Sequence, residues 1–336
     1  MKPKIYVTRI IPPPGIYLLE GSCQVTVHES DEPPARKDIL ENIGDKDGIL
    51  CLLTDTIDKD VMEAAPNLKV ISTMSVGFEH IDIQEATRRG IYIGCTPGVL
   101  TEATADLAFA LLLAAARKIV SADSFVRNKN WKISWSPNIF HGESLWGGTI
   151  GIIGLGRVGK AVAKRARGFN MKILYTDIKP IPPDKEKEMV VEYRSLEELL
   201  KMSDFVTIHT PLTKETRHMI DEKKLKLMKS TAILINTSRG AVIDEKALIS
   251  ALGGGWIGAA GLDVFEEEPV DADSPFLLLE NVVLLPHIGS STKQTRAKMS
   301  ELAALNLLAA LKGEAPLHWL NPHVEKIRPF SKIKML

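Results

Sequence analysis

Short runs of β-branched and other apolar residues alternate with amphipathic stretches along the first hundred positions. The runs that predict strands are KIYVT at 4–8, GILCLL at 48–53, KVIST at 69–73 and IYIG at 91–94. Between them, apolar residues recur at helical spacing near residues 35–43, 58–64 and 82–89. Alternation of this kind predicts a parallel sheet with helices on its faces.

A second and more regular series follows a long helical pattern at 101–118. Thr101 is the expected N-cap of that helix, with Glu102 in its first turn and Arg117 and Lys118 in its last, charges that suit the helix dipole. The strands expected after it lie at 149–153, 171–176, 204–208, 232–236, 258–264 and 282–285. A last helix, about 291–312, ends before Gly313, which is typical of a C-terminal cap.

The two series predict an α/β protein with two Rossmann-like domains, each a doubly wound parallel sheet. The chain of 336 residues agrees, since domains average roughly 150 residues. We expect one domain at 101–289. The other would combine 1–100 with 290–336 and have a flavodoxin-like, discontinuous sheet, because the final helix starts after the second series is complete.

Composition favours a soluble globular protein, with 45% apolar and 25% charged residues. The formal net charge is zero, so no footprint for nucleic acid or anionic lipid is expected. Cys23, Cys51 and Cys95 lie far apart, which favours buried thiols over a disulfide framework or a metal site. No secretory signal or bilayer-length apolar segment is evident, and we expect a cytoplasmic protein.

The sequence G-L-G-R-V-G at 154–159 follows the strand 149–153 and opens the helical pattern 160–168. Three glycines at this spacing allow a tight turn, close approach of backbone amides to a pyrophosphate, and close helix–strand packing. The phosphate would then lie at the positive helix N-terminus. Asp177 ends the next strand, about where a ribose-binding carboxylate belongs. Together these features predict a dinucleotide site and make 101–289 the dinucleotide-binding domain.

Asp177 also bears on the choice of cofactor. A carboxylate accepts hydrogen bonds from the ribose 2′-hydroxyl and repels a 2′-phosphate, which favours NAD. Arg157 and Lys179 are cations that could contact a 2′-phosphate if Asp177 turned away, so NADP remains the alternative cofactor.

Three further segments stand at the ends of predicted strands. They are N-T-S-R-G at 236–240, L-D-V-F-E-E-E-P at 262–269 and L-P-H-I-G-S-S-T at 285–292. Ligands of an open α/β sheet bind at the carboxyl ends of its strands, so all three segments should face the cofactor.

These segments and the glycine loop, with S-V-G-F-E-H-I-D at 75–82 and T-E-A-T-A-D-L-A-F-A-L-L-L-A at 101–114, resemble the D-2-hydroxyacid dehydrogenase family. The similarity is to its glyoxylate/hydroxypyruvate reductase branch and extends over essentially the whole chain in family order. It implies a homodimer, with 101–118 an interface helix, that reduces a small 2-oxo acid, glyoxylate or hydroxypyruvate, with NAD(P)H.

The resemblance implies roles for several side chains. Arg239 would bind the substrate carboxylate with its planar fork and polarise the carbonyl. His287 would be the general acid, giving a proton to the carbonyl oxygen. Glu268 would hydrogen-bond the other ring nitrogen and favour the protonated ring. The backbone amides of Val76 and Gly77 would hold the substrate carboxylate from the other domain.

The resemblance also implies cofactor contacts. Asp263 would hold the nicotinamide carboxamide, while Thr237, Ser238 and the turn at Thr210–Pro211 would line the nicotinamide ribose. The other expected cofactor contacts are Thr101, Gly154, Leu155, Gly156, Arg157, Val158, Gly159, Asp177, Thr216, Arg239, His287 and Gly289.

Apolar substrate contacts are predicted on two segments. Leu53, with Leu52 and Met74, would form an apolar wall, although such residues are more often simple core. In reductases of this branch a tryptophan reaches the partner subunit's active site, and Trp135 fits that place better than Trp131. Packing in the core or the dimer interface is the alternative for both tryptophans.

The chain departs from relatives in the family at several points. His80 replaces the more usual asparagine after Val76–Gly77. The chain ends soon after the last helix, without the regulatory domain of many phosphoglycerate dehydrogenases, and no basic cluster beside Val76–Gly77 could grip a phosphate. The formate dehydrogenase branch has glutamine in place of Glu268.

Two alternatives remain open. The chain could be another D-2-hydroxyacid dehydrogenase, acting on phosphoglycerate, D-lactate or phosphite. It could also be an NAD(H)-sensing binding protein like the corepressors of this fold, although those usually carry longer interaction tails than residues 313–336.

Overall fold

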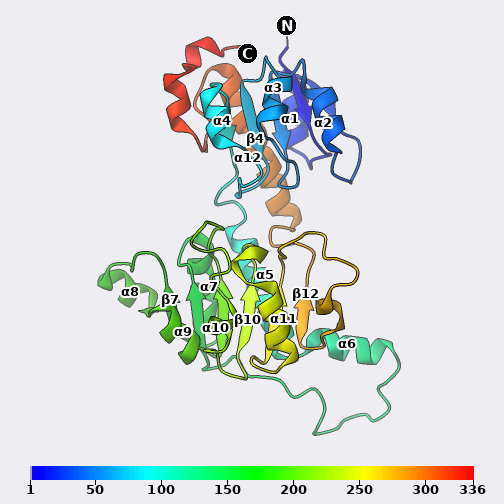
Figure 1. Cartoon of the computed structure of the whole chain (residues 1–336), viewed down its shortest axis with the longest axis vertical. Helices are drawn as coiled ribbons and strands as arrows, with labels where there is room; N and C mark the ends of the chain where they lie inside the picture. Colours follow the sequence, from blue (N-terminus) through cyan, green and yellow to red (C-terminus); the bar gives the residue numbers. More distant parts are fainter. Residues whose placement is uncertain (1) are drawn as a thin grey trace. The chain divides into compact units, whose positions relative to one another are not determined.

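Both predicted parallel sheets are present in the computed structural model, which describes residues 2–336 (Figure 1). The chain divides into two compact units. Unit 1 consists of Met1–Leu100 and Ser291–Leu336, and unit 2 of Thr101–Ser290. The predicted fold class, with two parallel-sheet α/β domains, is confirmed.

Unit 1 is built on a five-stranded parallel sheet. Its strands, in spatial order, are β2 (Gln24–Val27), β1 (Lys4–Val7), β3 (Gly48–Cys51), β4 (Val70–Thr73) and β5 (Tyr92–Gly94). The register pairs Ile5 with Gly48 and Gly48 with Val70. The order 2-1-3-4-5 is that of flavodoxin-like sheets.

Helices cover both faces of this sheet. They are α1 (Gly15–Ser22), α2 (Arg36–Ile43), α3 (Lys59–Ala64), α4 (Ile83–Arg88) and α12 (Lys293–Lys312). Successive strand residues face opposite sides, so Ile5 and Val7 join the core under α1 and α12, whereas Tyr6 joins the core under α2, α3 and α4.

Helix α12 is bound to the first hundred residues by buried hydrogen bonds. The Ser72 hydroxyl donates to the Ala303 carbonyl at 2.7 Å, and the Asn306 amide donates to the Cys95 carbonyl at 2.8 Å. Gly313, with φ of +75°, ends the helix as predicted. Beyond it, two short 3-10 helices, η3 (Pro322–Lys326) and η4 (Phe330–Lys332), complete unit 1.

Unit 2 is built on a seven-stranded parallel sheet. Its strands, in spatial order, are β12 (Val282–Leu284), β11 (Ala259–Leu262), β10 (Ile233–Asn236), β9 (Phe205–Ile208), β6 (Thr149–Ile153), β7 (Lys172–Thr176) and β8 (Glu192–Tyr193). The strand order reverses between β6 and β9. Ligands of doubly wound sheets bind beside such a reversal, at the carboxyl ends of the strands.

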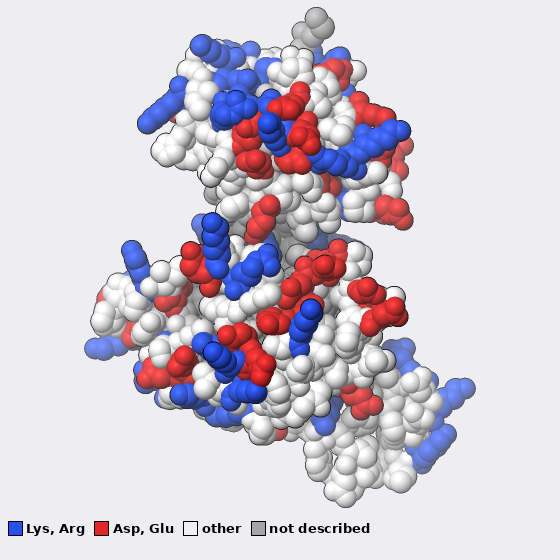
Figure 2. Space-filling view, in the orientation of Figure 1, with Lys and Arg blue, Asp and Glu red and all other residues white. Residues whose placement is uncertain are grey.

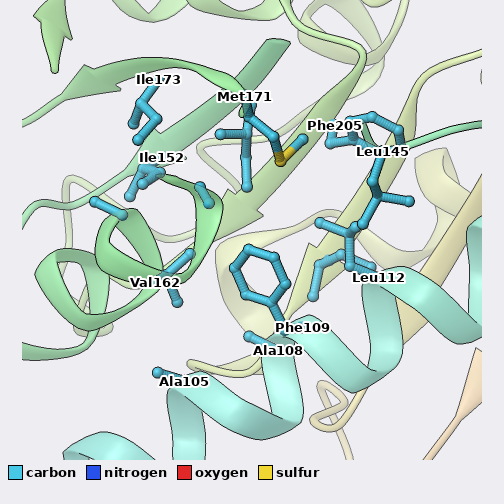
Figure 3. Packing of buried hydrophobic residues seen from close by; sticks show 14 of the residues in the cluster. Ala105, Ala108, Phe109, Leu112, Leu145, Ile152, Val162, Met171, Ile173 and Phe205 are labelled. Atoms are coloured by element: carbon cyan, nitrogen blue, oxygen red, sulfur yellow. The ribbon is translucent and has the colours of Figure 1, made fainter. Parts of the chain in front are cut away.

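Two layers of helices enclose the sheet of unit 2. On one face lie α5 (Thr101–Ala116) and α7 (Arg157–Gly168), and on the other α9 (Leu196–Met202), α10 (Glu222–Leu225) and α11 (Glu245–Gly253). Figure 3 shows Phe109 of α5 among Val162, Ile152 and Phe205, side chains of α7 and the strands. This packing fixes the strand ends that carry the candidate site.

Some elements differ from the sequence-based expectations. Thr101 is the first residue of α5 rather than its N-cap, and the helix stops at Ala116, since Lys118 has a left-handed φ of 52°. Helix α7 begins at Arg157 instead of Lys160. The apolar pattern did not predict α1, β2, α6 (Ile119–Arg127), α8 (Pro183–Met189) or β8.

The visible surface carries both signs of charge in close alternation (Figure 2). Among the residues that the structure describes, no helix is long and apolar enough to cross a membrane.

Candidate active site

The three glycines of the loop after β6 differ in how much space a side chain would have at their positions. Gly154 has φ of +93°, and a Cβ there would lie 2.8 Å from the His209 carbonyl oxygen. A Cβ on Gly159 would lie 2.1 Å from the Gly154 carbonyl oxygen. A Cβ on Gly156 would meet nothing within 4 Å. Gly154 and Gly159 therefore serve the turn and the helix packing, while Gly156 leaves its backbone open to a ligand.

The loop leads into the N-terminus of α7, and Asp177 is fixed beside it. Among residues 2–336, no side chain caps α7 and no acidic residue lies in its first turn, so its positive end is uncompensated. The Asp177 carboxylate accepts hydrogen bonds from the amides of Leu155 and Ile178, both at 2.7 Å. These bonds hold the carboxylate at the glycine loop. Arg157 and Lys179 are exposed.

Two threonines at the carboxyl ends of β9 and β10 have unused hydrogen-bonding capacity. Within the described chain, the buried hydroxyl oxygens of Thr210 and Thr237 have no hydrogen-bond partner. Such atoms are rare in folded proteins and call for a polar partner. With the open Gly156 and the uncapped helix, they fit a dinucleotide lying across the β6–β9 reversal. Thr216 closes the adjoining turn by donating to the Pro211 carbonyl at 2.7 Å.

His287 and Glu268 form a hydrogen-bonded pair beyond the end of β12. The Nδ1 atom of His287 lies 2.7 Å from Oε2 of Glu268, and roughly a third of each side chain is exposed. Because an ionised carboxylate only accepts, Nδ1 carries the proton of this bond. His287 has a left-handed φ of 53°, and its amide donates to the Asp263 carbonyl at 2.9 Å. The second ring nitrogen, Nε2, is the one left to act on a substrate.

Glu268 is held in its ionised form. Burial acts to raise its pKa, but the hydrogen bond and charge of His287, the Phe265 amide at 3.0 Å and the charge of Arg239 together lower the pKa below its ordinary value. Its neighbour Glu266 has different partners, since it exchanges hydrogen bonds with Glu245 and pairs with a histidine of another turn.

Arg239 follows β10 in a turn that Asn236 organises. The side chain of Asn236, which is fully buried, donates to the Arg239 carbonyl at 2.8 Å and accepts from the Ser238 amide and hydroxyl at 3.0 and 2.8 Å. The Arg239 Nη1 donates to the Ser238 carbonyl at 2.7 Å. Asn236 lies in the segment N-T-S-R-G at 236–240, but the sequence alone does not predict its part in this turn.

Gly240 lets the arginine and glutamate segments meet. A Cβ there would lie 1.9 Å from the Phe265 carbonyl carbon and 2.1 Å from its oxygen. Only a residue without a side chain allows this backbone contact. The sequence pattern gives no sign of this role.

Asp263 holds the segment after His287. This carboxylate, 1% exposed, accepts from the Ile288 amide at 2.7 Å and the Gly289 amide at 2.8 Å. Burial raises its pKa, against the effect of these two hydrogen bonds and of the His287 charge. The observed contacts are structural, and the predicted contact with a nicotinamide carboxamide stays a prediction. Nearby, the Thr104 hydroxyl donates to the Gly289 carbonyl at 3.2 Å.

His209 lies next to the glycine loop and was not predicted. It follows β9, its carbonyl contacts Gly154, and its Nε2 lies 2.9 Å from the Thr207 hydroxyl. Burial lowers the pKa of His209 to about 3, so its ring is neutral near pH 7.

In unit 1, Val76 and Gly77 form a loop after β4. Val76 is 39% exposed, and neither backbone amide donates a hydrogen bond within residues 2–336. Two uncommitted neighbouring amides can bind an anion. Leu53 is 40% exposed, whereas Met74 lies in the core and does not form an open wall.

Trp135 lies on the arm formed by α6 and the segment up to β6. It is 75% exposed, and none of the residues of α6 is buried. Trp131, at 55% exposure, lies on the same arm, so neither tryptophan packs in the core of unit 2. Thr101 starts α5, and Val158 lies in the first turn of α7.

The sequence and the fold were compared with known proteins. Residues 109–289 match the family model for the D-isomer specific 2-hydroxyacid dehydrogenase, NAD binding domain. A glyoxylate reductase of Thermofilum pendens is 54% identical over 336 residues, covering 100% of this chain and 99% of the relative. One from Thermococcus litoralis is also 54% identical, covering 96% and 98%.

Solved structures share the whole fold. A protein from Thermus thermophilus aligns with a TM-score of 0.89 and 43% identity, covering 94% of this chain and 99% of that chain. An NADPH-dependent glyoxylate/hydroxypyruvate reductase from Sinorhizobium meliloti, in complex with NADP and malonate, aligns with a TM-score of 0.83 and 32% identity, covering 96% and 98%.

Proposed function

Since the chain belongs to the D-isomer specific 2-hydroxyacid dehydrogenase family, we propose that it reduces glyoxylate, and hydroxypyruvate as a related substrate, with NAD(P)H. The observation that carries the proposal is the convergence of His287, Glu268 and Arg239 at the strand ends of a sheet that also presents the glycine loop. The names of relatives at 54% identity favour glyoxylate over phosphoglycerate, D-lactate or phosphite.

In the proposed reaction each side chain has one task. The bound nicotinamide would supply the hydride to the carbonyl carbon. Arg239 binds the carboxylate and draws electron density from the carbonyl oxygen. His287 gives the proton on Nε2 to that oxygen, so the double bond becomes an alcohol. The Glu268 carboxylate keeps Nδ1 protonated and stabilises the charged ring before the transfer.

We further propose that NAD(H) is preferred. Asp177 is fixed by two backbone amides at the glycine loop, so it could not move away from a 2′-phosphate without breaking them. The ribose hydroxyl of NADH would instead donate to it. The relative solved with NADP makes the ratio of the two cofactors a direct measurement.

A homodimer is proposed through the arm of unit 2. Its exposed apolar side chains, each at least 45% accessible, are Ile119, Val120, Val126, Trp131, Ile133, Trp135, Ile139 and Trp146. Apolar groups gathered in this way usually mark an interaction site. Light scattering after size exclusion should give twice 37.0 kDa, and a monomer would refute the proposal. Trp135 at the partner's active site and a cytoplasmic location stay predictions.

The activity is tested by absorbance at 340 nm. Glyoxylate, hydroxypyruvate, pyruvate and 3-phosphohydroxypyruvate are each offered with NADH and with NADPH. Fast loss with the first two acids is expected. Loss only with the phosphorylated acid would replace the proposed substrate, and NADH binding without any turnover would favour the sensor function.

A further inference from the structure

The loop that carries Val76 and Gly77 is tied to β4 by a chain of side-chain hydrogen bonds. The Thr73 hydroxyl oxygen lies 2.7 Å from the Ser75 hydroxyl and 3.1 Å from Nε2 of His80. The Ser75 hydroxyl donates to the Gly77 carbonyl at 2.6 Å. Thr73 is fully buried and Ser75 is 4% exposed, so water does not replace these bonds.

The donor and the acceptor of each hydrogen bond follow from the number of protons that each group carries. A carbonyl oxygen only accepts, so Ser75 uses its one proton on Gly77. Thr73 must then donate to Ser75, and its own oxygen accepts from His80. Nε2 of His80 therefore carries a proton, and all bonds run from His80 to Gly77.

The backbone on both sides of these side-chain hydrogen bonds is anchored to other segments. The Thr96 amide donates to the Ser75 carbonyl at 2.9 Å, and the Ile57 amide donates to the His80 carbonyl at 2.8 Å. The Gly77 carbonyl is thus held by a side chain while the Val76 and Gly77 amides remain uncommitted. A buried chain of donors also polarises the peptide at its end.

We propose that His80, Thr73 and Ser75 are positioning residues that preset the Val76–Gly77 amides for a substrate carboxylate. The proposal rests on the proposed function, because it takes these amides as a carboxylate site. It gives His80 a specific task at a position where asparagine is more usual in the family. The amide nitrogen of asparagine takes the place of Nδ1 rather than Nε2, so the bond to Thr73 is specific to histidine at this position.

The test removes the Thr73 hydroxyl, which links His80 to Ser75. Thr73→Val keeps the side-chain shape and removes both hydrogen bonds, whereas Thr73→Ser keeps the hydroxyl. The KM for glyoxylate should rise about tenfold in Thr73→Val, the factor that one net hydrogen bond represents. In Thr73→Ser it should change less than about twofold. Affinity for NADH, measured by fluorescence, should be unchanged in both variants.

Ser72→Ala is the matched control for lost stability. It removes a buried hydroxyl from the neighbouring position of the same strand, where the partner is Ala303 and not the loop. It should lower the melting temperature as Thr73→Val does, with an unchanged KM. An equal KM in Thr73→Val, Thr73→Ser and Ser72→Ala would overturn the proposal while leaving the proposed function intact.

If the wild type reduces none of the 2-oxo acids, the proposed function fails and the positioning role is decided by binding alone. Calorimetry with oxamate, a non-reactive carboxylate, would then compare wild type, Thr73→Val and Thr73→Ser. Weaker binding only in Thr73→Val would support the proposal. Equal binding, or none by the wild type, would overturn it.

A spectroscopic measurement tests whether Nε2 of His80 is the donor in its hydrogen bond to Thr73. In a sample with ¹⁵N-labelled histidine, with His80→Asn used for assignment, the Nε2 of His80 should be protonated. A bare Nε2 would overturn the proposal. His80→Gln, whose amide nitrogen can take the place of Nε2, should keep the KM for glyoxylate, while His80→Leu, which removes the donor, should raise it.

Discussion

Gly240→Ala is the substitution whose effect the structure predicts most directly. The new methyl group would lie 1.9 Å from the Phe265 carbonyl carbon, and ordinary contact begins at 3.4 Å. One of the two backbones must therefore move by about 1.5 Å, the difference 3.4 − 1.9. Both neighbours are backbone atoms of a buried segment, so no flexible side chain can absorb the change.

The displacement reaches the catalytic pair through one hydrogen bond. The Phe265 amide donates to Oε1 of Glu268, whose other oxygen orients His287. A misplacement of 1 Å can cost about 10²-fold in rate, so kcat/KM for glyoxylate should fall roughly 10²- to 10³-fold. Overpacking should also lower the free energy of unfolding by about 1–3 kcal/mol, which leaves the protein folded at 25 °C.

The assay is steady-state oxidation of NADH at 340 nm, with circular dichroism to establish folding. Gly253→Ala is the control, because a Cβ at that end of α11 meets nothing within 4 Å. It should leave kcat/KM unchanged. A folded Gly240→Ala protein with kcat/KM within about threefold of wild type would refute the argument that this close approach sets the geometry of the pair.

Three other predictions follow from the same geometry. His287→Ala should lower kcat roughly 10²- to 10⁴-fold in the 340 nm assay while NADH still binds; lost NADH binding would make His287 structural. Asp177→Ala should raise the ratio of kcat/KM with NADPH to that with NADH, and an unchanged ratio would remove Asp177 from the ribose site. The ring of His209 titrates near 6.5 when unfolded but has a folded pKa of about 3, so its contribution to stability is present above pH 6.5 and is lost as the pH falls. Between pH 6.5 and 5 the free energy of unfolding should fall by at most about 2 kcal/mol from this group, since the side chain is only partly buried. Urea unfolding at both pH values should show a smaller fall in His209→Gln than in the wild type. Equal falls in the two proteins would contradict the lowered pKa of His209.

The elements that sequence predicted are those that bury a continuous apolar run. All four residues of β3 and β4 are buried, and parallel strands covered on both faces give such runs. The edge strand β2 is only partly buried and gives no continuous apolar run. Helix α6 does carry apolar side chains, but none of its residues is buried within unit 2, so these side chains do not belong to the core of that unit.

Sequence also located the strand-end segments of the candidate site, because parallel strands bring their carboxyl ends to one edge. The sequence could not predict which groups of these segments form hydrogen bonds with one another. The burial of Asp263 against two amides and the contact at Gly240 depend on approaches between segments that are distant in the sequence. The turn organised by Asn236 is local, but it depends on a side chain whose burial the sequence pattern does not show. The chain of bonds from His80 to Gly77 is short in sequence, yet its direction depends on which atoms are buried together.

The bonds between α12 and the first hundred residues also bear on how the protein is made. Ser72 and Ala303 are separated by 231 positions, and all of unit 2 is synthesised between them. On the ribosome, unit 2 is a contiguous segment that can fold as soon as it emerges, whereas unit 1 must wait with one apolar face of its sheet covered by α1 alone. That interval exposes the face formed by Ile5 and Val7 to aggregation, and chaperones would act on it there.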